Sequence, residues 1–108
     1  MTAENSLSRT ILESAILDVK PGQAQAFEAA MRQARPLIAA TPGFISIAVR
    51  RCVETPSRYL LLVEWETLEA HTIGFRQSPR YQEWRALLHH FYAPFPTVEH
   101  FEADIGNS

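Results

Sequence analysis

The sequence contains little cysteine: Cys52 is the only one among 108 residues. A lone thiol excludes an intrachain disulfide and any zinc site built from several thiolates. Disulfides are typical of oxidising compartments, so this composition gives no indication of secretion. The first residues also lack the apolar segment of a signal peptide. We therefore expect a cytoplasmic protein.

Long apolar runs and an excess of basic residues are missing as well. No segment approaches the roughly 18 apolar residues that a membrane-spanning helix needs, so we expect no membrane association. The 10 Lys and Arg residues against 12 Asp and Glu residues give a net charge of −2 at pH 7. Proteins that bind nucleic acid usually carry a basic stripe and a high pI, so this balance argues against a nucleic-acid partner.

Recognisable cofactor motifs are absent too. The sequence has no glycine-rich phosphate loop and no nucleophile elbow. Its 4 histidines lack the paired spacing of a zinc or non-haem iron site. We therefore expect neither a cofactor nor a bound metal.

The residues that are present predict one globular domain. The apolar fraction of 46% and the charged fraction of 20% are ordinary for a soluble protein. A chain of this length has room for one hydrophobic core. We assign residues 10–104 to this domain, and we expect residues 1–9 to be disordered and residues 105–108 to be frayed.

Hydrophobic periodicity predicts elements in the order β-α-β-β-α-β. The first helix is expected to bury an apolar stripe that runs from Phe27 to Ile38. Ser78 followed by Pro79 is a strong start signal for a later helix, and Thr67 is a suitable N-cap for a short helix before it. The expected strands are 10–19, 44–53, 58–66 and 97–103, and the expected helices are 23–40, a short one after Thr67, and 79–91.

This order is the split β-α-β, or ferredoxin-like, arrangement of the α+β class, with a four-stranded antiparallel sheet and helices on one face. The other face would be bare, yet both faces of the third strand carry large apolar residues. Tyr59, Leu61, Val63 and Trp65 alternate there with Leu60, Leu62, Glu64 and Glu66. Soluble monomers rarely expose an apolar face of this size. We therefore expect a homodimer that packs sheet to sheet.

His71 is the residue that says most about function. At helical spacing its neighbours are Leu68, Thr72 and Phe75, which form a mostly apolar face. A titratable ring on such a face is either a core histidine satisfied by a hydrogen bond or the chemical centre of a pocket. The sequence leaves both interpretations open.

Four short segments resemble the antibiotic biosynthesis monooxygenase (ABM) family in their order and spacing. They are Lys20-Pro21-Gly22 before the first helix, Pro42-Gly43-Phe44 at the second strand, Val63-Glu64-Trp65-Glu66 before the histidine, and Ser78-Pro79-Arg80-Tyr81 after it. The resemblance covers residues 10–102. It implies a dimeric α+β barrel with a pocket between sheet and helices in each subunit.

The resemblance also implies a chemistry. Members of this family oxygenate anthrones or quinols without flavin, haem or metal, which predicts a small aromatic substrate that carries a hydroxyl group. His71 would then be the general base, because an unperturbed imidazole titrates near pH 6.5. The other expected substrate-binding residues are the aromatic walls Trp65, Phe75, Tyr81 and Trp84, and the anion-stabilising Arg76 and His100.

Each of these roles has a structural alternative. Tyr81 and Trp84 have the spacing of core residues, Trp65 fits a dimer contact, and His100 fits a structural or interfacial position.

Two other functions remain possible for a protein with this fold. One is an isomerase or lyase, in which His71 moves a proton and no oxygen is consumed. The other is a dimer that binds small molecules without catalysis.

Overall fold

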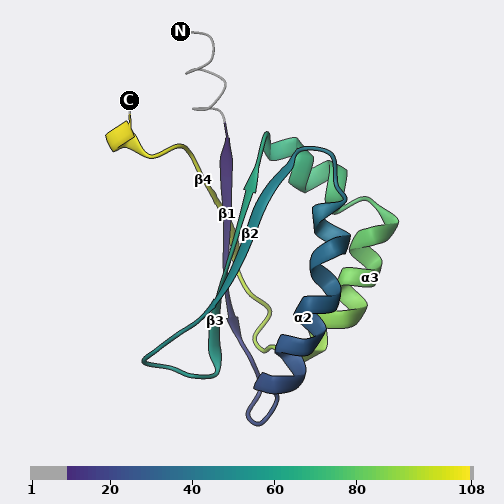
Figure 1. Ribbon diagram of the computed structural model, residues 1–108, viewed down its shortest axis with the longest axis vertical. Coiled ribbons are helices and arrows are strands. Elements are labelled where there is room, and N and C mark those ends of the chain that lie inside the picture. The colour runs from purple at the N-terminus through teal and green to yellow at the C-terminus, as the bar shows by residue number, and fades with distance from the viewer. Residues whose placement is uncertain (1–9, 108) are drawn as a thin grey trace, which may run out of the picture.

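The computed structural model describes residues 10–107, so the expected disordered segment 1–9 and Ser108 lie outside the described residues. The predicted α+β order β-α-β-β-α-β is confirmed (Figure 1). The elements are β1 (Ile11–Asp18), α2 (Ala24–Ala39), β2 (Phe44–Arg51), β3 (Arg58–Trp65), a short helix η1 (Ala70–Phe75), α3 (Pro79–Leu88), a 3-10 turn η2 (His89–Phe91) and β4 (Val98–Phe101). A further 3-10 turn, η3 (Ile105–Asn107), occupies the end that was expected to be frayed.

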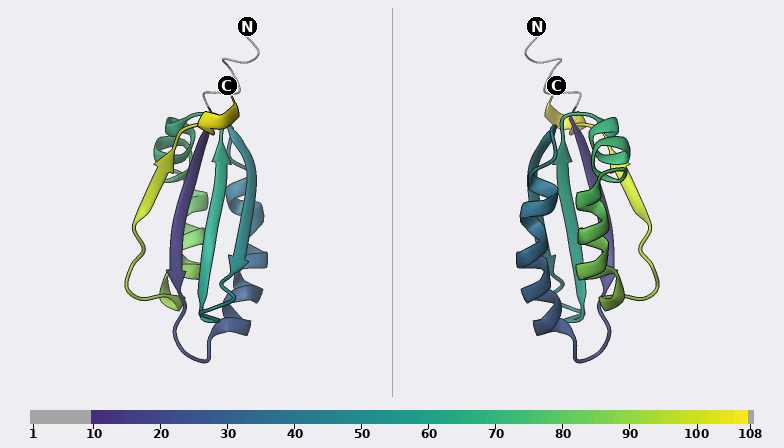
Figure 2. Two further views of the ribbon diagram at one scale, coloured as in Figure 1. Left: turned by 90° about the vertical axis from the view of Figure 1, so that its left-hand side faces the viewer. Right: turned by 90° about the vertical axis from the view of Figure 1, so that its right-hand side faces the viewer.

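Four antiparallel strands form the sheet in the order β2-β3-β1-β4. The central strands β1 and β3 pair along their whole length, with Ile11 opposite Trp65. β2 and β3 are consecutive strands and pair as an antiparallel hairpin. β4 pairs with the other side of β1 and sets His100 opposite Glu13. Helices α2 and α3 cover one face of the sheet, and no described element covers the other (Figure 2).

The core lies between the sheet and the helices. Alternation along β1 turns Ala15 and Leu17 toward the helices, where both are buried. Most of the predicted stripe of α2 is also buried, namely Phe27, Met31, Ala34 and Ile38, while Ala30 and Leu37 in the same stripe are half-buried. Burying an aliphatic or aromatic side chain of this size contributes roughly 1.5–3 kcal/mol. These contacts hold the helices against one face of the sheet.

The short helix that carries His71 is a π-helix over Ala70–Phe75. Thr67 Oγ1 accepts a hydrogen bond from the Ala70 N–H at 3.1 Å, as expected of the predicted N-cap. The Arg76 N–H donates a hydrogen bond to the His71 carbonyl at 3.1 Å. This bond joins residues five positions apart, which is the wide turn of a π-helix. Such turns are rare in proteins and often lie at functional sites.

The inward face of this segment differs from the predicted one at Leu68. Ordinary helical spacing predicted Leu68 on the inward face beside His71, but Leu68 is 39% exposed. His71 and Phe75 are both buried. The prediction for Leu68 is therefore wrong: Leu68 precedes the π-helix, in the turn after Thr67, and does not share the buried face of His71 and Phe75.

Helix α3 begins where the sequence predicts. Ser78 Oγ accepts a hydrogen bond from the Tyr81 N–H at 3.3 Å, and Pro79 is the first helical residue. The α-helix gives way to η2 instead of continuing to residue 91. The Lys20 N–H donates to the Phe91 carbonyl at 2.8 Å, which fastens η2 to the chain just after β1.

Gly43, immediately before β2, lies very close to the π-helix, and a substitution there measures how closely the two pack. Its φ of +92° is in the left-handed region, and a Cβ added there would lie 2.6 Å from the Ala70 Cβ at the start of η1. We expect Gly43→Ala to lower the free energy of unfolding by about 3 kcal/mol, because it combines backbone strain with overpacking. Urea unfolding measures this loss.

Gly22→Ala is the matched control for this prediction. Gly22 also has a positive φ, +78°, but a Cβ there would meet nothing within 4 Å. We expect only the cost of the backbone conformation, about 1 kcal/mol. Equal losses in the two variants would contradict the close approach of Gly43 to Ala70.

Candidate functional site

A cavity of about 360 Å³ lies between the sheet and the helices. The side chains of Glu13, His71 and Arg76 line it, together with several aromatic rings. Those rings belong to Phe75, Tyr81, Trp84, His89, Tyr92 and Phe95. Arg76 and Phe95 are exposed, so these two lie where the cavity meets solvent. The remaining wall is mostly aliphatic.

Glu13 is an acid on the buried face of β1. It lies on the same side of the strand as Ala15, and it is only 4% exposed. The Trp65 Nε1–H donates to its Oε1 at 2.9 Å. Burial raises the pKa of Glu13, and the hydrogen bond from Trp65 and the charge of Arg76 offset part of that rise. The protein therefore replaces the hydration of this carboxylate only in part.

His71 is held by contacts at both ring nitrogens. Its Nδ1 lies 2.8 Å from Nε2 of His100 on β4. Its Nε2 lies 3.4 Å from Oε1 of Glu13 on β1. The ring stacks on Trp65 of β3, with centroids 5.2 Å apart and planes 16° apart. Three strands therefore fix the orientation of this imidazole.

The His71 ring is neutral at physiological pH. Burial, with smaller contributions from Arg76 and His100, lowers the pKa of His71 to about 3. Burial and Arg76 also lower the pKa of His100. Since the pKa of Glu13 shifts upward at the same place, the contact between Glu13 and His71 is a polar contact of an uncharged ring rather than an ion pair.

The structure brings most of the predicted site residues together. Those that line the cavity are His71, Phe75, Arg76, Tyr81 and Trp84. His100 is not among the lining residues and contacts His71 from β4. Trp65 has no exposed surface and stacks on His71 instead of lining the cavity. The alternative interpretation of Trp65 as a dimer contact is wrong, because its side chain faces the helices.

Glu13 is the most important lining residue that the sequence interpretation missed. A signal for it existed, since strict alternation places residue 13 on the same face as Ala15 and Leu17. His89, Tyr92 and Phe95 were also missed. They come from η2 and the loop after it, where no periodic pattern indicates which side chains turn inward.

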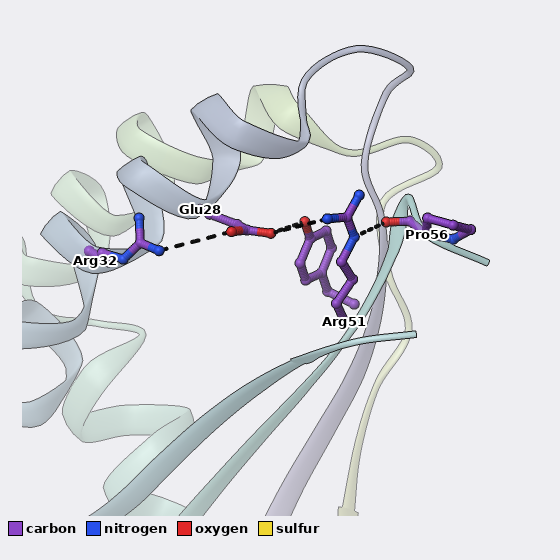
Figure 3. Close-up of polar contacts among 5 residues, drawn as sticks. Glu28, Arg32, Arg51 and Pro56 are labelled. Atoms are coloured by element: carbon purple, nitrogen blue, oxygen red, sulfur yellow. Dashed lines mark hydrogen bonds and ion pairs between the residues drawn. The ribbon is translucent and has the colours of Figure 1, made fainter. Parts of the chain in front are cut away.

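A second polar cluster joins α2 to β2, β3 and the turn between these strands (Figure 3). None of its residues lines the cavity described above. The Tyr59 hydroxyl donates to Glu28 Oε2 at 2.5 Å, and burial followed by Glu28 raises the pKa of Tyr59 to about 12. Arg32 and Arg51 each lie 3.9 Å from a Glu28 oxygen, and Arg51 Nε donates to the Pro56 carbonyl at 2.6 Å. These groups satisfy one another, so the cluster links the helix to the strands.

Two kinds of feature are missing from residues 10–107. This part of the chain has no group of three or more His, Cys, Asp or Glu side chains placed to hold a metal ion. None of its helices combines the length and the apolar composition needed to cross a bilayer.

Comparison with known proteins gives close relatives along most of the chain. The sequence profile of the antibiotic biosynthesis monooxygenase family matches residues 10–87. The uncharacterized protein YczJ of Bacillus subtilis (strain 168) is 58% identical over 92 residues, which cover 85% of this chain and 97% of that protein. A crystal structure from Bordetella bronchiseptica, assigned to the same family, has 42% identity and a TM-score of 0.84, and the match covers 89% of this chain and 98% of that one.

Two more distant structures share the fold. SnoaB, a cofactor-independent oxygenase from Streptomyces nogalater, has 17% identity and a TM-score of 0.71, with 93% of this chain and 96% of that chain covered. The ActVA-Orf6 monooxygenase of Streptomyces coelicolor, in complex with Nanaomycin D, has 20% identity and a TM-score of 0.75, with 93% and 92% covered. The profile match and the closer relatives confirm the resemblance seen in the four sequence segments. This chain belongs to the antibiotic biosynthesis monooxygenase family.

Proposed function

We propose that this protein is a cofactor-independent monooxygenase that acts on a small hydroxylated aromatic compound, such as a quinol or an anthrone. The observation that carries the proposal is the cavity of about 360 Å³, in which aromatic walls surround Glu13, His71 and Arg76. A cavity of this volume suits a small molecule. Aromatic walls favour a flat guest, because rings stack on one another or pack edge to face.

The names of two distant relatives agree with this substrate class. SnoaB is a cofactor-independent oxygenase, and ActVA-Orf6 is a monooxygenase in complex with Nanaomycin D. Their identity to this chain shows a common fold only, so the proposal depends on the cavity and takes the substrate class from these relatives by analogy.

The proposed reaction needs a substrate that can itself reduce dioxygen. Loss of the hydroxyl proton makes the aromatic anion electron-rich, and the anion passes one electron to dioxygen. The resulting radical and superoxide combine through a new C–O bond into a peroxide anion. This anion takes the proton back from the acid–base group and then eliminates water. The substrate thereby loses two hydrogen atoms and gains one oxygen atom, and the second oxygen atom leaves as water.

The side chains of the cavity divide this work. His71 and Glu13 together form the acid–base group that removes the hydroxyl proton. Arg76 carries the positive charge that stabilises the aromatic anion. The rings that hold the substrate are Phe75, Tyr81 and Trp84.

We also propose that the protein is a homodimer, formed through the uncovered face of the sheet. The outward positions of β1, β3 and β4 carry the apolar residues Leu12, Ile16, Leu60, Leu62 and Phe101. Ile16 is 45% exposed and Phe101 is 48% exposed in the single chain. A second copy presenting the same face would cover this apolar surface in a symmetric contact.

Oxygen uptake tests the proposed reaction. Metal-free protein supplied with an anthrone or a quinol is expected to consume oxygen. His71→Ala is expected to lower the rate at least ~100-fold, the usual contribution of acid–base catalysis. His90→Ala is the control and is expected to keep the rate, because His90 is exposed and does not line the cavity. An oxygen electrode measures all three proteins.

Two outcomes would contradict the proposed reaction. A wild-type rate in His71→Ala would exclude His71 from the acid–base group. Turnover that continues without oxygen would indicate an isomerase or a lyase on the same scaffold.

The neutral state of His71 predicts how stability depends on pH. Its folded-state pKa of about 3 lies below the ordinary value of 6.5, so the unfolded chain takes up a proton first as the pH falls. The contribution of His71 to stability is complete above pH 6.5 and is lost between pH 6.5 and about 3. His71→Gln does not titrate, so it is expected to lose less stability than the wild type over this range. Urea unfolding at a series of pH values measures the difference, and identical curves would contradict the lowered pKa.

The size of the particle in solution tests the dimer. The wild-type protein is expected to elute as a dimer in size-exclusion chromatography with light scattering. Leu62→Glu is expected to produce monomers, because it places a charge at the centre of the apolar face. Val53→Glu is the control, since Val53 is 88% exposed in the turn between β2 and β3. A monomeric wild-type protein would contradict the proposed dimer.

A further inference from the structure

One carboxylate oxygen of Glu13 has no partner among the residues that the structure describes. Its Oε1 takes both of its contacts, the Trp65 N–H at 2.9 Å and His71 Nε2 at 3.4 Å. Within residues 10–107 its second oxygen, Oε2, has no hydrogen-bond partner. The side chain lines the cavity and is only 4% exposed. A ligand hydroxyl in the cavity is therefore the natural partner for Oε2.

The two ring nitrogens of His71 are, by contrast, both occupied. A neutral imidazole has one N–H and one lone pair. Nδ1 lies at hydrogen-bond distance from His100 Nε2, and Nε2 faces Glu13 Oε1 at the longer distance of 3.4 Å. To take a proton from a substrate, His71 would have to give up one of these contacts, whereas Glu13 would give up none.

We propose that Glu13, and not His71, accepts the hydroxyl proton of the substrate, and that His71 is a positioning residue that holds the Glu13 carboxylate in place. This assignment rests on the proposed function. The O–H bond of the substrate breaks, the proton moves to Oε2 of Glu13, and the electron pair stays on the substrate oxygen. The net charge of the cavity does not change, because the negative charge moves from Glu13 to the substrate. Arg76 lines the same cavity and balances that charge.

The electrostatics of the pair agree with this geometry. Burial raises the pKa of Glu13, which makes its carboxylate a stronger base. Burial lowers the pKa of His71 to about 3, which makes the imidazole a weaker one. A general base works best when its pKa is near the working pH. The interior of the protein moves Glu13 toward that condition and moves His71 away from it.

Binding of 4-nitrophenolate tests the assignment without any oxygen chemistry. At a pH above the pKa of the free phenol, the ligand enters the cavity as an anion. Beside this anion, Glu13 is expected to take up a proton from the buffer. Titration calorimetry in two buffers of different ionisation enthalpy measures the uptake. The absorbance of the bound dye shows whether it has stayed a phenolate, as we expect.

Three variants locate the proton. Glu13→Gln keeps an acceptor for the Trp65 N–H and is expected to abolish the uptake. His71→Gln is expected to keep the uptake, with weaker binding, because the carboxylate is still present. Glu64→Gln is the matched control. Glu64 is exposed on β3, accepts a hydrogen bond from the Ser46 hydroxyl and does not line the cavity. It is expected to behave like the wild type, and thermal unfolding verifies that each variant is folded.

Three results would overturn the assignment. The first is proton uptake that persists in Glu13→Gln. The second is uptake that disappears in His71→Gln, which would make the imidazole the acceptor. The third is a wild-type complex in which the dye has the spectrum of the neutral phenol, because the proton would then be on the ligand.

Oxygen uptake with an anthrone gives a second readout of the same assignment. Glu13→Gln is expected to lower kcat at least ~100-fold, and Glu13→Asp is expected to keep part of the activity. A wild-type kcat in Glu13→Gln would overturn the assignment. If the wild-type protein consumes no oxygen with any hydroxylated aromatic compound, the proposed function fails, while the dye titration still decides the role of Glu13.

Discussion

The burial of one carboxyl group, that of Glu13, is the constraint around which the site is organised. Moving a carboxylate out of water is unfavourable unless groups of the protein replace its hydration. Here Trp65 donates an N–H to it, and His71 lies beside the same oxygen. The replacement is incomplete, and the pKa of Glu13 stays raised. An acid held in this way changes its protonation state readily when a charged or hydroxylated ligand enters the cavity.

The fold supplies each part of this arrangement. The pairing of β1 with β4 sets Glu13 opposite His100, and the pairing of β1 with β3 brings Trp65 to the same end of the sheet. The π-turn of η1 buries His71 against these strands. Trp65 contacts both residues: its N–H donates a hydrogen bond to Glu13, and its ring stacks on His71. A side chain that does not line the cavity thus sets the geometry of two that do.

Most of the fold follows from patterns that span only a few residues. The cap at Ser78, the buried stripe of α2 and the alternation along β3 depend on neighbours in sequence, so the element order could be predicted. His71 could be singled out because a titratable ring on an apolar face stands out. The partner of Glu13, however, is Trp65, 52 positions away, and only the strand register joins them. The π-turn was not predictable for a related reason: no pattern in its own few residues distinguishes its wider turn from that of an α-helix.

Titration of the Glu13 carboxyl group tests the central claim most directly. Protein labelled with ¹³C at the glutamate side-chain carboxyl carbon gives one NMR signal per residue, and the spectrum of Glu13→Gln identifies the signal of Glu13. We predict a midpoint above 4.5, the ordinary value for glutamate, because burial disfavours the charged form. A midpoint at or below 4.5 would show that the protein stabilises the carboxylate fully. The site would then have no buried acid that is ready to accept a proton.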